Sequence, residues 1–74
     1  MSYMKDILQA LHDRACAEHN NASMNVKMMA EHPVGIGEHG DIMQEVYDQL
    51  KKMEQSDSMV HFIDKMLEKT QDED

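Results

Sequence analysis

The chain has 74 residues, of which 15 are acidic and 7 basic, so its formal net charge is −8. This length allows one domain, the single cysteine excludes an internal disulfide, and the acidic excess argues against direct binding to nucleic acid or to anionic membrane surfaces. No apolar run approaches the ~20 residues of a membrane-spanning helix, and the first residues lack the layout of a signal peptide. The composition therefore predicts a cytoplasmic protein.

Residues 2–31 have the spacing of one long helix. Ser2 is a suitable N-cap, and core-facing positions recur every three or four residues. This row consists of Met4, Leu8, Leu11, Ala15, His19, Ala22, Val26 and Met29. Steps of eleven residues, as from Met4 to Ala15 to Val26, favour nearly straight packing over a strict heptad coil.

The only proline and all three glycines fall in residues 32–40. Proline ends a helix and glycine supplies positive φ, so this segment is predicted to be a structured turn. Its three glycines match the dinucleotide-binding spacing, but that fingerprint requires a preceding strand, and a helix precedes it here. The turn residues are Pro33, Val34, Gly35, Ile36, Gly37 and Gly40.

A second helix is predicted over residues 41–70, with Asp41 as its cap. Its apolar row consists of Ile42, Val46, Leu50, Met53, Val60, Ile63 and Leu67. The inward position between Met53 and Val60 falls on Ser56 or Asp57, which makes this stretch a weak point where the helix could kink or fray. Residues 71–74 are an acidic tail that we expect to be disordered.

These elements predict an all-α fold, an antiparallel hairpin over residues 1–70 with two helices of roughly 42 Å. Each helix can bury only the row that faces the other, so the remaining apolar side chains need a second surface. A homodimer that forms a four-helix bundle supplies one. A complex with a different protein would supply one equally well.

The chain contains nine methionines, which suit both irregular core gaps and adaptable binding surfaces. Both interpretations remain open. The predicted partner surface consists of Met24, Met28, Tyr47, Met59, Phe62 and Met66.

His12, Cys16 and His19 have helical spacing and are ligand types that zinc accepts. Three ligands spread along one straight helix cannot close on one ion without a contribution from a partner. We therefore favour packed side chains here and predict no metal or cofactor. A two-helix chain also has little concave interior for a catalytic site, so we expect no enzyme activity.

The turn sequence Pro-Val-Gly-Ile-Gly-Glu-His-Gly-Asp-Ile, residues 33–42, resembles a small uncharacterised family of T4-like tailed phages, including phages of marine cyanobacteria. Its members resemble short acidic proteins with such a turn between two helical arms. The specific match covers about ten residues, and the arms match only in character. The resemblance implies a viral origin and a helical hairpin, and it implies no catalytic or binding residue.

We therefore expect a small non-enzymatic acidic interaction protein, a phage accessory protein that binds a host or phage protein. Its acidic surface would steer association with a basic partner. The alternative is a structural or assembly component of a virus particle. A third hypothesis is a metal- or ligand-binding helical bundle that uses the histidines.

Overall fold

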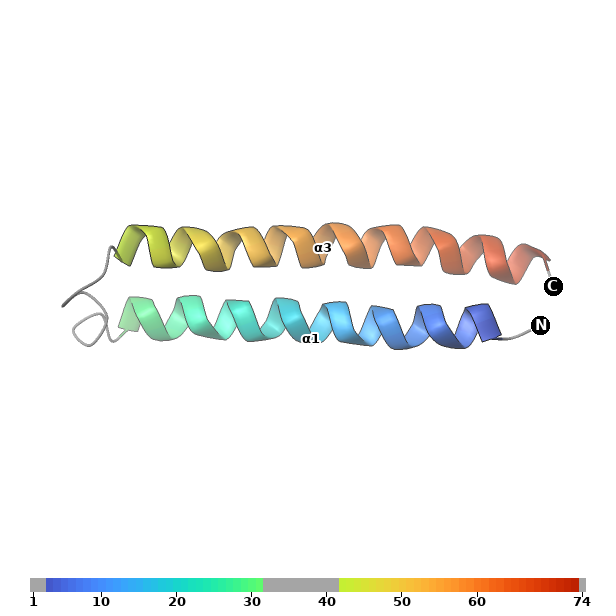
Figure 1. Ribbon diagram of the computed structural model, residues 1–74, viewed down its shortest axis with the longest axis horizontal. Helices are drawn as coiled ribbons and strands as arrows, with labels where there is room; N and C mark the ends of the chain where they lie inside the picture. Colours follow the sequence, from blue (N-terminus) through green and yellow to red (C-terminus); the bar gives the residue numbers. More distant parts are fainter. Residues whose placement is uncertain (1–2, 32–41, 74) are drawn as a thin grey trace.

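The computed structural model is an antiparallel helical hairpin, which confirms the all-α prediction (Figure 1). Helix α1 spans Tyr3–Glu31 and helix α3 spans Ile42–Glu73. The structure describes residues 3–31 and 42–73, with side chains described up to residue 70. The two helices lie side by side along their full length, in a rod of 55 × 16 × 14 Å. The start of α1 and the end of α3 share one end of the rod, which we call the open end.

Both helices begin and end within three residues of the expected positions. Helix α1 covers all but the first residue of the expected stretch 2–31, and α3 begins one residue after the expected start. Helix α3 also includes residues 71–73, where the sequence suggests a disordered tail. Extending an existing helix adds one hydrogen bond per residue without a new nucleation cost, and near this end the Thr70 hydroxyl donates to the Met66 carbonyl at 2.9 Å.

The predicted turn lies outside the described residues, and so does the predicted helix cap. This concerns Pro33, Val34, Gly35, Ile36, Gly37, Gly40 and Asp41.

The buried side chains follow a heptad pattern. On α1 they are Leu8, Ala15 and Ala22, and on α3 they are Gln49, Ser56 and Ile63, each seven residues apart. We call this line of contact the seam. Partly buried positions such as His12 and Val60 fall between them, which completes the alternating three- and four-residue spacing of a coiled coil.

The expected eleven-residue packing is therefore wrong. In a seven-residue register, Met4, Leu11 and Leu50 fall beside the seam and are exposed, although the sequence analysis placed them in the core rows. The expected weak point is continuous helix in the structure, and Ser56 is its inward residue. A short hydroxyl side chain occupies little space where two helices approach closely, so the polar residue does not interrupt α3.

The seam is thin. Apart from Leu8 and Ile63 its buried residues are small or polar, and no described side chain is completely buried. Asn25 Nδ2 donates a hydrogen bond to Gln49 Oε1 at 3.2 Å, which joins the helices and satisfies the oxygen of the buried amide. A fold this small has little core to stabilise it.

Candidate functional site

One side of the seam, which we call the groove face, carries an apolar depression near the open end. Its volume is about 380 Å³. Both helices contribute, because the residues that flank the seam on this side follow the same heptad register. The lining consists of Leu8, Leu11, Arg14, Ala15, Glu18, Met59, Phe62, Ile63 and Met66.

A second depression of about 450 Å³ continues the first along the same side of the rod. The two share Glu18 and Met59, so they form one groove. The second depression is more polar than the first, with Asn21, Ala22, Gln49, Lys52, Gln55 and Ser56 as its other lining residues. The groove thus becomes more polar with distance from the open end.

The predicted partner surface is divided by the structure. Met59, Phe62 and Met66 lie together in the apolar part of the groove, and the Phe62 side chain is 62% exposed. Tyr47, 57% exposed, lines a separate depression of about 430 Å³ with Ile42, Met43, Val46 and Leu50. Met24 and Met28 are exposed and line none of these three depressions.

The contribution of α1 to the groove was not predicted from the sequence. Leu11 was placed in the core row, yet it is 43% exposed and lines the apolar depression beside Phe62. The heptad spacing of Leu8, Ala15 and Ala22 was the pattern that could have revealed this. With that row facing α3, Leu11 must lie on its flank.

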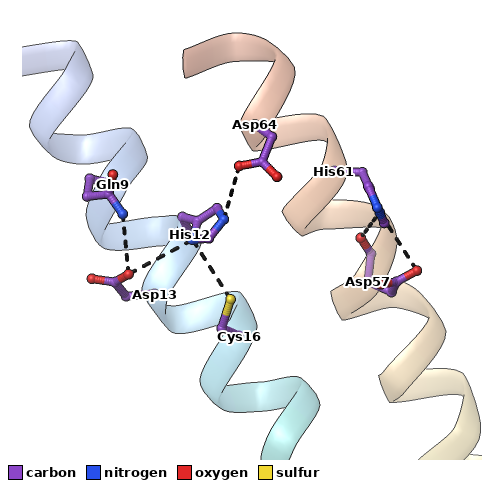
Figure 2. Close-up of polar contacts among 7 residues, drawn as sticks. All are labelled: Gln9, His12, Asp13, Cys16, Asp57, His61 and Asp64. Carbon is purple, nitrogen blue, oxygen red and sulfur yellow. Dashed lines mark hydrogen bonds and ion pairs between the residues drawn. The ribbon is translucent and has the colours of Figure 1, made fainter. Parts of the chain in front are cut away.

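The opposite side of the seam is acidic. His12 of α1 and Asp64 of α3 meet on this side, and Asp13, Asp57 and His61 are visible in the same view (Figure 2). In the heptad register, six acidic residues flank the seam on this side, against one basic residue, Lys27. The acidic residues of this face are Asp6, Asp13, Glu54, Asp57, Asp64 and Glu68.

Charge on the groove face is balanced. The same register places three basic and three acidic described side chains beside the groove, namely Arg14, Lys52, Lys69, Glu18, Glu45 and Asp48. Two of them pair with one another, since Arg14 Nε lies 3.3 Å from Glu18 Oε2. The excess negative charge of these flanks is therefore on the side away from the groove.

His12 makes the most connected polar cluster of the described residues (Figure 2). Its Nε2 lies 3.1 Å from Asp64 Oδ1 of the other helix, and its Nδ1 lies 3.8 Å from Cys16 Sγ. His19 takes part in neither contact. Helical spacing in the sequence groups His12 with Cys16 but does not indicate Asp64, because Asp64 comes from α3 and only the pairing of the helices brings it close.

This cluster has the order of a nucleophile, a base and an orienting carboxylate. Cys16 is only partly exposed, and neither Cys16 nor His12 lines any of the three depressions. None of the three described depressions would bring a substrate to Cys16 or His12. We therefore interpret the cluster as a structural polar contact between α1 and α3. Within residues 3–31 and 42–73, no three His, Cys, Asp or Glu side chains are arranged to hold a metal ion.

Comparison of the chain with protein-family models, curated proteins and solved structures gave no match. In the part of the chain that the structure describes, neither helix combines the length and the apolar character needed to cross a membrane.

Proposed function

We propose that this chain is a non-enzymatic interaction protein that binds another helical surface through its groove face. The observation that supports this most is the exposure of large apolar side chains in the groove, above all Phe62. A partner that covered them would gain about 25 cal/mol for each Å² of apolar surface removed from water. A groove of Leu, Met and Phe side chains between two helices suits an amphipathic helix.

The proposal includes self-association, because the hairpin alone has a thin seam and chains of this size usually need a further source of stability. Two hairpins packed together form a four-helix bundle. The acidic face would then remain accessible and could steer a basic partner protein toward the bundle.

The resemblance of residues 33–42 to a phage family adds a viral origin to the proposal, with a role as an accessory protein that binds a host or phage protein. The alternative proposal is a component of the virus particle. Mass spectrometry of purified particles from the source phage separates the two, because a component is present at constant stoichiometry and an accessory protein is absent.

The binding role can be tested by photo-cross-linking in cells. A photoreactive benzoylphenylalanine replaces Phe62 in one variant and Tyr47 in a matched control, since both are exposed aromatic residues of α3 on different faces. We expect a discrete covalent adduct from position 62 and little from position 47. Adducts from position 47 alone, or from neither position, would contradict the proposal.

A further inference from the structure

We infer that the occupant of the groove is a second copy of this chain, packed groove to groove with the two open ends at the same end of the bundle. This inference rests on the proposed binding role of the groove and specifies its partner and orientation. Three features of the described residues support it, namely the distribution of charge, the change in polarity along the groove and the size of the face.

Charge favours this face for self-association. Two copies with a net charge of −8 repel one another. They associate best through the face that keeps the acidic residues of one copy farthest from those of the other. Among the residues whose side chains the structure describes, the groove face has three basic and three acidic flanking residues, whereas the opposite flank has six acidic residues and one basic residue. Groove-to-groove packing keeps the acidic faces on the outside, separated by two hairpins of at least 14 Å each. The Debye length at physiological salt is about 8 Å.

The same balance argues against a strongly basic peptide as the occupant. Lys52 lines the polar part of the groove, Arg14 lines the apolar part and already pairs with Glu18, and Lys69 flanks the open end. A basic helix would gain little attraction here, and a second copy brings the same balanced set of charges.

The change in polarity determines the orientation. Leu11, Phe62 and Met66 line the groove near the open end, whereas Asn21, Gln49 and Gln55 line it farther along. If the open ends pointed in opposite directions, each apolar half would cover the partner's amide groups, and burying these groups without partners is unfavourable. With the open ends together, apolar side chains meet apolar ones and amides meet amides, which can both donate and accept hydrogen bonds.

In this orientation α1 of each copy packs against α3 of the other, and all neighbouring helices are antiparallel. Leu11 of one copy then lies near Phe62 of the other, because the two residues line the same depression at a similar height along the rod. The rod measures 55 by 16 Å, so one side has about the 800 Å² per partner that a specific interface buries.

Sedimentation equilibrium of the purified chain tests the choice of face. We expect a dimer for the unmodified chain, a dissociation constant raised at least ~10-fold by Phe62→Lys, and a change below ~3-fold for Tyr47→Lys, the matched aromatic on the other face. Circular dichroism of each variant reports whether the helices form. A larger effect of Tyr47→Lys than of Phe62→Lys would overturn the inference.

A mixing experiment tests the orientation and guards against misfolded variants. Leu11→Glu and Phe62→Lys each weaken self-association when present alone. In an equimolar mixture we expect dimers to return, because the new carboxylate of one copy lies beside the new ammonium group of the other. If the mixture stays monomeric, the proposed orientation is wrong.

The failure of this inference differs from the failure of the proposed function. If the purified chain is monomeric but position 62 cross-links to a different protein in cells, the groove is a binding site and the second copy is the wrong occupant. If position 62 gives no adduct at all and the chain is monomeric, the binding role itself is wrong.

Discussion

Ile63 is the side chain whose loss should affect the hairpin most. It is 3% exposed and is the most buried of the large apolar residues described. Replacing it by alanine removes three buried carbon groups, worth ~0.8 kcal/mol each, and leaves a cavity. We expect Ile63→Ala to lower the free energy of unfolding by about 2.5–4 kcal/mol. A small single core supplies only ~3–5 kcal/mol, so this variant should retain little stability and show a substantial unfolded fraction at room temperature.

Leu50→Ala is the matched control, because Leu50 is 46% exposed and lies beside the seam. Truncating it leaves no enclosed cavity and should cost about 1 kcal/mol or less. Urea denaturation followed by far-UV circular dichroism measures both variants at one protein concentration, which is needed because self-association adds to apparent stability. If both variants lost the same free energy of unfolding, and the slope of that free energy against urea concentration did not change, the heptad assignment of the seam would be refuted.

Three further predictions follow from the polar contacts and the charge. Asn25→Ala leaves the Gln49 amide unpaired and should cost about 1–3 kcal/mol, whereas the double variant with Gln49→Leu should recover most of that loss in a double-mutant cycle by urea denaturation. His12→Ala should lower the thermal midpoint more than His61→Ala, because His12 contacts the other helix and the His61 contacts stay within α3; equal shifts would contradict this. Raising NaCl from about 50 mM to about 500 mM should lower the dissociation constant of the dimer in sedimentation, because salt screens the repulsion between two acidic chains. Weaker association at high salt would indicate instead that ion pairs hold the interface.

The core of the hairpin was only partly predictable from the sequence. Leu8, Ala15 and Ile63 were placed correctly because apolar residues at three- and four-residue steps mark one helix face. Leu11 and Leu50 fit the same steps and were misplaced. The heptad spacing of Leu8, Ala15 and Ala22 offered the correct row on α1, but the choice between overlapping rows also depends on which residues of the other helix lie opposite.

The polar residues illustrate the same limit. Gln49 and Ser56 are buried in the seam; the sequence offered Ser56 only as an alternative to Asp57, and it did not indicate Gln49. Both helices must approach closely at these positions, where Ala22 and Ser56 line the same depression, and small or hydrogen-bonded polar side chains permit that approach. The contact of His12 with Asp64 joins residues that no local pattern could associate.

The sequence by itself determined the two helices and the absence of a second cysteine for a disulfide, because spacing, propensity and residue counts are local properties. It also determined the acidic excess, although not its position. Only the tertiary structure decided that this charge lies on one side of the seam and the apolar groove on the other. The pairing of α1 with α3 decides which side chains of the two helices lie on the same face. That pairing arises from packing across the seam and is not a local property of either helix.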